Sequence, residues 1–262
     1  MKENIKIVGF IPAHLASVRF KKKILHKIFG IPMVEHVRRR SLNAKVIEKI
    51  IVASGDKDIL DSVEKYGGET KQTFKDHKNG TSRIAEAVKD IDCSHVVIIQ
   101  GDEPLIQTDH LKRITEAIRL NPSYESWNST SELNSEKELY NPNVVKAALN
   151  NEKRILYFFR NSPSFKDPQK QFLYIKKVQG LIAFKKEILM QIVSAPINIC
   201  EEIESIEQLK IIANGLNIYS VYQKSQVPSI NTIEDLKDLY NYFENNKSEL
   251  ELTKKLINKS FF

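Results

Sequence analysis

The feature that most constrains the fold is an alternation of short apolar runs with amphipathic segments over the first 120 residues. Three apolar runs have the length of buried strands: Ile5–Ile11, Val46–Ala53 and Val96–Gln100. Segments with apolar residues at helical spacing predict helices over 33–42, 56–66, 82–88 and 109–120. This order is typical of a doubly wound parallel sheet. We therefore expect an α/β fold with a Rossmann-like, mostly parallel sheet flanked by helices.

The alternation breaks after residue 120. Residues 121–143 are polar, contain two prolines and show little periodicity. Beyond them we expect strands at 144–149, 154–159, 178–184 and 218–222, and helices at 203–214 and 232–243. We interpret residues 1–244 as one domain with an inserted β-rich lobe at about 144–184. Residues 245–262 are lysine-rich, and we expect a polar tail that is helical or frayed.

The net charge of +7 is compatible with a nucleic-acid surface, a membrane surface or small anionic ligands. The basic residues are spread over the chain, whereas a nucleic-acid site should gather them on one patch. We therefore expect phosphate-bearing small molecules as partners, and no nucleic acid. No apolar stretch approaches 18 residues, the N-terminus lacks a signal-peptide layout, and the two cysteines lack metal-ligand spacing. These features predict a cytoplasmic protein that does not span a membrane.

The most informative segment is VVIIQGDEPLI, residues 96–106. A hydrophobic strand ends at Gln100, and the carboxylates Asp102 and Glu103 follow at its carboxyl end. Ligands of open α/β sheets bind at this edge. A carboxylate placed there can hold Mg²⁺ while a phosphate supplies further oxygens. The alternative is an acidic loop that merely caps the following helix.

Two further segments carry groups that could bind phosphate. The loop IPAHLASVRFKKKIL, residues 11–25, combines small residues with Arg19 and Lys23, and could wrap a triphosphate through backbone N–H groups and cations. It lacks the P-loop pattern, and it could be a solvated basic loop. In DHKNGTSRIAEA, residues 76–87, Thr81 is a candidate helix N-cap, and Arg83 could donate to a base or phosphate at the helix start.

In this order the segments resemble the CMP-Kdo synthetases, the 3-deoxy-manno-octulosonate cytidylyltransferases, over roughly residues 5–240. The family's IPAR-x-x-S-x-R-x-x-x-K-x-L is similar to residues 11–25 here, and its DH-x-x-GT-x-R and QGDEP motifs are present at 76–83 and 100–104. NPN-x-VK recurs at 141–146, and E-x-x-E-x-x-EQL at 201–209. The resemblance implies a fold of the nucleotide-diphospho-sugar transferase type, Mg²⁺ as cofactor, and a homodimer.

The resemblance also implies a role for each matching residue. Ala13, Ser17, Arg19 and Lys23 would hold the CTP phosphates, and Gly80, Thr81, Arg83 and Gln100 would surround the nucleotide. Arg160, Glu207 and Gln208 would face the sugar acid, and Asp102 and Asn231 would hold the metal. Arg19, Lys23 and Asp102 would be catalytic. The implied reaction transfers CMP from CTP to the anomeric hydroxyl of Kdo, releases pyrophosphate, and serves lipopolysaccharide synthesis, without a covalent intermediate.

Four departures from the family pattern bear on this reading. His14 replaces the IPAR arginine, Lys21-Lys22 replaces a proline-glycine turn, and Asn231 replaces a metal-binding aspartate. In the acceptor motif HLG-x-Y-x-Y, Val178 and Ile182 replace the histidine and the first tyrosine. A pocket that loses its polar partners rejects a hydroxyl-bearing ligand. Two alternatives therefore remain: the same chemistry on 8-amino-Kdo, another sugar acid or a phosphorylated or phosphonate compound, or a degenerate nucleotide-binding protein.

Overall fold

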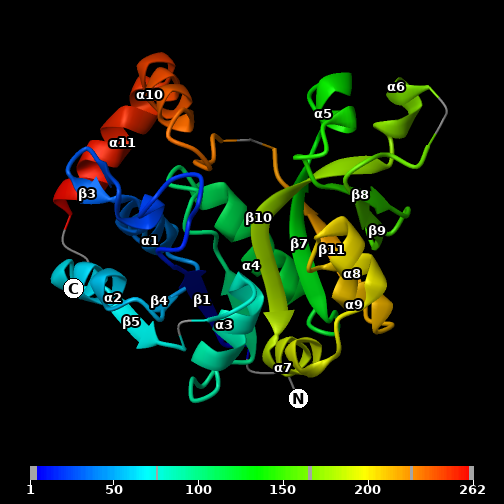
Figure 1. The fold of residues 1–262 in the computed structure, drawn as a ribbon, viewed down its shortest axis with the longest axis horizontal. Coiled ribbons are helices and arrows are strands. Elements are labelled where there is room, and N and C mark those ends of the chain that lie inside the picture. The colour runs from blue at the N-terminus through cyan, green and yellow to red at the C-terminus, as the bar shows by residue number, and fades with distance from the viewer. Residues whose placement is uncertain (1–4, 75, 165–166, 225–226, 260–262) are drawn as a thin grey trace.

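The computed structural model describes residues 5–74, 76–164, 167–224 and 227–259. A nine-stranded mixed sheet forms its centre, with strands in the order β11-β7-β10-β6-β1-β4-β5 and with β8 and β9 joined to β10 (Figure 1). The strands are β1 (Ile7–Pro12), β4 (Ile50–Ser54), β5 (Glu69–Gln72), β6 (His95–Ile98), β7 (Ser126–Ser131), β8 (Lys146–Leu149), β9 (Ile155–Phe159), β10 (Ile175–Lys185) and β11 (Ile218–Tyr222). A separate two-stranded hairpin pairs β2 (Lys27–Ile28) with β3 (Ile31–Pro32).

The sheet is parallel except at β10 and in the β8–β9 hairpin. Strands β6, β1, β4 and β5 pair in parallel, as do β7 and β11, whereas β10 runs antiparallel between β6 and β7. The predicted Rossmann-like, mostly parallel α/β fold is confirmed. The segment expected as a β-rich lobe forms a β8–β9 hairpin that is hydrogen-bonded to the first residues of β10, so it extends the main sheet.

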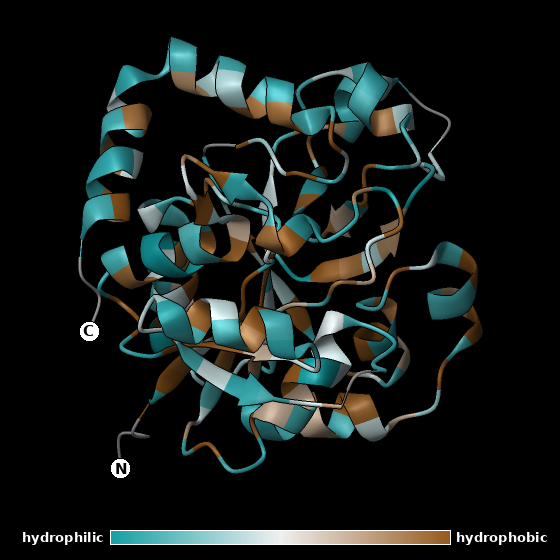
Figure 2. Cartoon of the chain, turned by 60° about the vertical axis from the view of Figure 1, so that its left-hand side comes forward, coloured by the Kyte–Doolittle hydropathy of each residue, from teal (hydrophilic) through white to brown (hydrophobic). Residues whose placement is uncertain are grey.

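Helices cover both faces of the sheet. They are α1 (Met33–Asn43), α2 (Lys57–Lys65), α3 (Gly80–Ala87), α4 (Thr108–Leu120), α5 (Glu136–Tyr140), α6 (Pro168–Gln171), α7 (Lys186–Ser194), α8 (Ile199–Glu204), α9 (Leu209–Ala213), α10 (Asp235–Asn245) and α11 (Lys247–Asn258). In Figure 2 the helices are banded in teal and brown, as expected for helices with one buried face.

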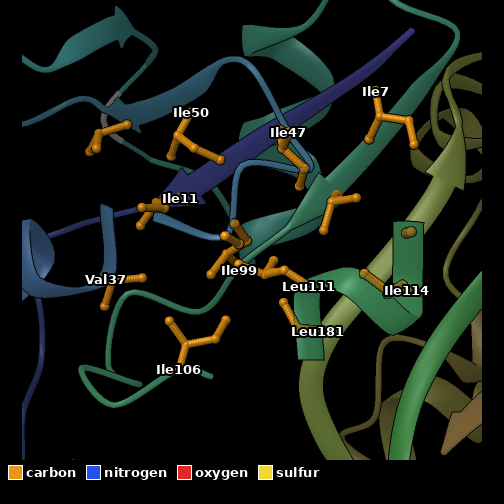
Figure 3. Close-up of a cluster of buried hydrophobic side chains, with 14 of the residues drawn as sticks. Ile7, Ile11, Val37, Ile47, Ile50, Ile99, Ile106, Leu111, Ile114 and Leu181 are labelled. Carbon is orange, nitrogen blue, oxygen red and sulfur yellow. The ribbon is translucent and has the colours of Figure 1, made fainter. Parts of the chain in front are cut away.

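Side chains of each central strand alternate between two hydrophobic clusters. In β1, Ile7 and Ile11 face a cluster built with α1, α2 and α4, whereas Val8 and Phe10 face a cluster built with α3, α7 and α9. Figure 3 shows side chains of the first cluster converging from β1, β4, α4 and β10. The period of two explains why these strands read as continuous apolar runs: both faces are buried.

Two of the expectations for the second half are wrong in detail. The polar stretch 121–143 contains β7, a fully buried strand of the sheet with the sequence SWNSTS. The single helix expected at 203–214 is broken into α8 and α9 by Ser205, whose φ is 52°. Arg160 explains the break, because its guanidinium binds the carbonyls of Glu204 and Ser205 (2.7 and 3.1 Å) and removes them from helix bonding.

The C-terminal helices close the molecule on the side of the β2–β3 hairpin. α10 packs into a third hydrophobic cluster with Phe20, Leu105 and Ile230. α11 lies against α1, where Arg39 donates hydrogen bonds to the carbonyls of Leu256, Ile257 and Lys259. Residues 247–258 are thus helical, and one of their faces is packed. None of the helices in the described part of the chain combines the length and apolarity needed to cross a membrane.

Candidate active site

The candidate site lies where β1 and β6 end side by side. Phe10 of β1 pairs in parallel with Ile98 of β6, so the loops that follow the two strands leave at the same edge of the sheet. Gly101 allows their close approach. A Cβ atom there would lie 3.3 Å from the carbonyl oxygen of Pro12 and 3.0 Å from Cδ1 of Ile24. Any side chain at 101 would push the basic loop away from the acidic one.

An ion pair forms the charged centre of this edge. Lys23 Nζ lies 2.7 Å from Asp102 Oδ2, and only 11% of the lysine side chain is exposed against 28% of the aspartate. The pair lies in a cavity of about 410 Å³. Seven residues predicted for the nucleotide and metal line this cavity together: Ser17, Arg19, Lys23, Gly80, Gln100, Asp102 and Asn231. Residues 214 positions apart in the chain thus meet at one site.

The basic loop is anchored at both ends. The backbone N–H of Leu15 donates to Asp56 (2.9 Å), and Phe20 is buried in the third hydrophobic cluster. Between them Ser17 is half-buried and Arg19 is exposed. Lys22 adopts a left-handed backbone with φ 54°, which is the conformation that glycine favours. This explains why a glycine at this turn suits the family pattern and why Lys22 is a strained replacement. Ala13 buries its side chain in the core.

The cavity suits a magnesium ion that shares its ligands with phosphate. The N–H of Ile230 donates to the backbone carbonyl of Asp102 (2.9 Å), which places Asn231 beside that carboxylate. Lys23 contacts one oxygen of Asp102, and the second oxygen and the Asn231 amide oxygen are the groups that would be available to a metal. No cluster of three or more His, Cys, Asp or Glu residues that could hold a metal occurs in the described ranges. Mg²⁺ commonly takes one or two protein oxygens and completes its shell with water and phosphate.

A second cavity of about 710 Å³ adjoins the first and shares Pro12, His14 and Gly80 with it. Arg83 lines it, while its guanidinium also donates to Thr73 Oγ1 (2.7 Å) and to the carbonyl of Phe74 (3.1 Å). The N-cap of α3 is Asn79, whose side chain accepts the N–H of Ser82, so the prediction of Thr81 as N-cap is wrong. The hydroxyl of Thr81 instead donates a hydrogen bond in a third cavity.

That hydroxyl belongs to a third cavity, of about 500 Å³, which shares Lys78 and Asn79 with the second. Thr81 Oγ1 donates to Glu207 Oε1 (2.7 Å), and Gln208 lies beside it in the cavity wall. The other walls are largely apolar, with Ile182, Phe184, Ile192 and Ile211 among them. Neighbouring cavities share lining residues, so the three lie in a row from the Lys23–Asp102 pair to Glu207 and Gln208, and we call this row the groove.

Two buried carboxyl groups, Glu207 in the wall of the third cavity and Glu103 beside Asp102, have raised pKa values. Burial raises the pKa of Glu207, the charge of Glu201 adds to the rise, and the Thr81 hydrogen bond opposes it. Burial also raises the pKa of Glu103 to about 8, reinforced by the charge of Asp102. Carboxyls that burial and like charges perturb in this way are characteristic of functional sites.

Arg160 lies apart from the groove, and its role toward an acceptor stays a prediction. Its guanidinium donates to the carbonyls of Pro142, Glu204 and Ser205 (2.9, 2.7 and 3.1 Å). By ending α8 at Glu204, these bonds set the turn that carries Glu207 and Gln208 into the third cavity. The sequence also gave no sign of Asn128, which is fully buried and accepts a hydrogen bond from Gln208 (3.4 Å). Asn128 lies in SWNSTS, where five of six residues are polar, so no periodic pattern marks the strand.

The family model described as cytidylyltransferase matches residues 8–224, which is most of the chain. The chain belongs to the cytidylyltransferase family. Among its curated relatives, a 3-deoxy-manno-octulosonate cytidylyltransferase of Trichlorobacter lovleyi is 32% identical over 88% of this chain and 96% of that protein. One of the same name from Fusobacterium nucleatum is 30% identical over 94% of this chain and 100% of that protein.

Cytidylyltransferases also include a solved structure with the same architecture. CMP:2-keto-3-deoxy-manno-octonic acid synthetase complexed with CTP superposes with a TM-score of 0.86 at 28% identity, over 92% of this chain and 99% of that chain. The predicted family is confirmed, and the chain is a CTP-dependent nucleotidyltransferase by family.

Proposed function

We propose that this cytidylyltransferase transfers CMP from CTP to the anomeric hydroxyl of Kdo, giving CMP-Kdo for lipopolysaccharide synthesis. The observation that carries the proposal is the row of adjoining cavities. Its Lys23–Asp102 end has the charges that a triphosphate and a metal require, and its Glu207–Gln208 end has hydrogen-bonding groups for a sugar. Relatives at 32% identity carry the name of this activity.

The reaction is a direct displacement at the α-phosphorus. The sugar hydroxyl oxygen bonds to that phosphorus and gives up its proton to solvent, the bond to the bridging oxygen of the β-phosphate breaks, and pyrophosphate leaves. Arg19 and Lys23 would neutralise the charge that gathers on the leaving pyrophosphate. Ser17 and the loop N–H groups would orient the phosphates. Mg²⁺ held by Asp102 and Asn231 would add positive charge at the phosphates and orient the nucleophile.

A different acceptor is the second candidate, and one observation favours it. Ile182 and Phe184 place two apolar side chains in the third cavity, at positions where the family pattern has tyrosines. An acceptor that turns a hydroxyl toward this wall would lose its hydrogen bond there, at a cost of about 1–3 kcal/mol. An acceptor with fewer hydroxyls on that side would avoid this loss. The change to Ile182 and Phe184 should thus affect which acceptor binds and should leave nucleotide binding unchanged.

The decisive experiment measures pyrophosphate release from CTP with Mg²⁺ in the presence of Kdo, 8-amino-Kdo and a panel of acidic and phosphorylated acceptors. Release with Kdo, together with CMP-Kdo identified by mass spectrometry, is the expected result. Pyrophosphate release with a different compound and not with Kdo would identify that compound as the acceptor. CTP binding without pyrophosphate release in the presence of any acceptor would favour a degenerate nucleotide-binding protein.

Light scattering of the same preparation tests the homodimer that the family resemblance implies.

Replacing Asp102 with Asn tests the metal assignment. Because the substitution removes the negative charge beside Lys23, we expect kcat to fall by a factor of at least 10² at saturating CTP. The thermal midpoint should stay within a few degrees of wild type, since the side chain is partly exposed. Asp109→Asn is a matched control, because it removes an exposed carboxylate that pairs with Arg113 on α4. An active Asp102→Asn enzyme would contradict the assignment.

A further inference from the structure

Strand β10 carries a bulge between the two ends of the groove. Its pairing with β7 passes from Val178 opposite Thr130 to Ile182 opposite Asn128. Four positions on β10 thus span two on β7, and residues 179–181 are displaced from the ladder. Their backbone groups need partners outside the ladder, because an unpaired polar group costs about 1–3 kcal/mol when buried.

Asn128 supplies part of that pairing from β7. Its side chain is fully buried, and its Nδ2 lies 3.0 Å from the carbonyl of Gln179 and 3.2 Å from that of Leu181. The carbonyl of Ser129 lies at 3.0 Å, so three acceptors share two amide hydrogens. The hydroxyl of Ser129 donates to Leu181 as well (2.9 Å). The bulge is held by side chains where the regular ladder stops.

The same Asn128 amide also faces the groove. Its Oδ1 accepts a hydrogen bond from Gln208 Nε2 (3.4 Å), and Gln208 lines the third cavity. Because Nδ2 is engaged by the bulge, the amide cannot flip without losing both sets of bonds. The orientation of Asn128 therefore fixes which way the Gln208 amide points.

The opposite flank of the bulge contacts the acidic loop. The N–H of Gly180 donates to the carboxylate of Glu103, next to Asp102. A Cβ atom on residue 180 would overlap that carboxylate, and it would lie 2.9 Å from Cγ of Gln100. The bulge is thus packed between the loop of the metal carboxylate and the asparagine that orients Gln208.

We propose that Asn128 is a positioning residue for the acceptor: it holds the β10 bulge and aims the Gln208 amide into the third cavity. This inference rests on the proposed function, since it assigns that cavity to the acceptor. It predicts a larger effect on the acceptor than on the nucleotide, because Asn128 bonds directly to Gln208 and to the carbonyls of Gln179 and Leu181, and reaches the acidic loop only indirectly, through Gly180.

The test compares Asn128→Val with Thr130→Val, using the acceptor that wild type accepts. Thr130 is equally buried on the same strand, and its hydroxyl pairs with Ser220 (2.6 Å). We expect Asn128→Val to raise the KM for the acceptor at least tenfold while the Kd for CTP changes less than twofold. Thr130→Val should change neither. An unchanged acceptor KM in Asn128→Val, or a similar rise in both variants, would overturn the inference.

Two further measurements distinguish a lost positioning role from misfolding of the variant and from an incorrect choice of acceptor. Asn128→Thr keeps one donor on a β-branched side chain, and we expect an acceptor KM between those of wild type and Asn128→Val. Independently of activity, the Gln208 side-chain amide resonances, assigned with Gln208→Leu, should move in Asn128→Val and stay in place in Thr130→Val. Unmoved resonances would refute the positioning role, whereas moved resonances in an enzyme inactive with Kdo would refute only the proposed acceptor.

Discussion

At the scale of single residues, the nucleotide end of the groove divides its positive charge between two kinds of side chain. Lys23 is buried and paired with Asp102 before any nucleotide arrives, so the carboxylate is held in position. Arg19 is exposed on the anchored loop and reaches into the same cavity. A preformed carboxylate reduces the ordering that binding requires, and an exposed cation attracts the anionic ligand.

Asn231 leads to a prediction at the same scale. Replacing it with Asp adds a negative charge beside Asp102, where the amide oxygen alone carries none. We expect the Mg²⁺ concentration that gives half-maximal velocity to fall about tenfold, which corresponds to about 1.4 kcal/mol. Titrating Mg²⁺ at saturating CTP measures it. Asn241→Asp, which adds the same charge at an exposed position of α10, serves as the control. A half-saturation unchanged by Asn231→Asp would mean that residue 231 is not a ligand.

The meeting of the predicted residues around the Lys23–Asp102 pair has a physical reason. Most of these residues follow β1 and β6, whose apolar runs are unambiguous, and parallel neighbours bring their carboxyl ends together. The acceptor end was harder, because Gln208 and Asn128 approach one another through a bulge and a broken helix. Neither the bulge in β10 nor the break between α8 and α9 produces a periodic pattern in the sequence. Arg160, which ends α8, lies 44 residues before the Glu204 carbonyl that it binds.

At the scale of elements, β7 shows how a buried strand can escape detection. Five of its six side chains are polar, yet each is at most 1% exposed. Thr130 pairs with Ser220, and Ser129 and Asn128 bond carbonyls of β10. Satisfied polar groups are compatible with burial, so the strand needs no apolar pattern. Periodicity in a sequence reveals hydrophobic faces only. The polar side chains of β7 can be buried because hydrogen bonds satisfy them, so periodicity does not reveal this strand.

Helix α1 and the β2–β3 hairpin give a pH prediction. His36 of α1 is buried, and its Nε2 contacts the carbonyl of Ile28 (2.7 Å). Burial lowers the pKa of His36 from 6.5 to about 4, and the charges of Arg40 and Arg39 add to this, against the Ile28 hydrogen bond. The folded state thus keeps His36 neutral between these pH values, while the unfolded chain takes up a proton.

The free energy of unfolding should therefore decrease as the pH falls from 6.5 toward 4. The contribution of His36 between pH 7.5 and 5 is about 2 kcal/mol. Urea unfolding at the two pH values measures it, and His36→Gln should show a correspondingly flatter dependence. His14→Gln, which changes an exposed histidine, should retain the wild-type slope. Equal slopes in wild type and His36→Gln would show that His36 does not titrate in this way.

At the scale of the whole molecule, the third hydrophobic cluster joins the parts that build the nucleotide end. Phe20 comes from the basic loop, Leu105 follows the acidic loop, and Ile230 precedes Asn231. Leu239 and Phe243 of α10 complete the cluster, so the C-terminal part of the chain supports the site from behind. The loops that carry Phe20, Leu105 and Ile230 share this hydrophobic cluster. A substitution that opens a cavity in the cluster should therefore loosen all three loops.

Leu239→Ala tests this coupling. Leu239 is fully buried, and its truncation should lower the free energy of unfolding by about 2–5 kcal/mol. We also expect the Kd for CTP to rise severalfold, because the supports of Phe20 and Ile230 loosen together. Ile118→Ala creates a comparable cavity in a cluster under α4 and should leave the Kd near wild type. Calorimetric titration of the two variants separates lost stability from lost binding. Equal Kd values would show that the cluster and the site are independent.

The contact of α1 with α11 also has a consequence for biosynthesis. Arg39 and the carbonyl that it binds at Leu256 are 217 residues apart. At a synthesis rate of about 5–20 residues per second, α1 leaves the ribosome about 10–40 s before its partner exists. During that time Arg39 and Arg40 must stay hydrated on a nascent chain whose sheet is already assembling. The contact between α1 and α11 therefore forms only when translation has passed residue 256, and a ribosome stalled earlier would carry an α1 whose Arg39 lacks these carbonyl partners.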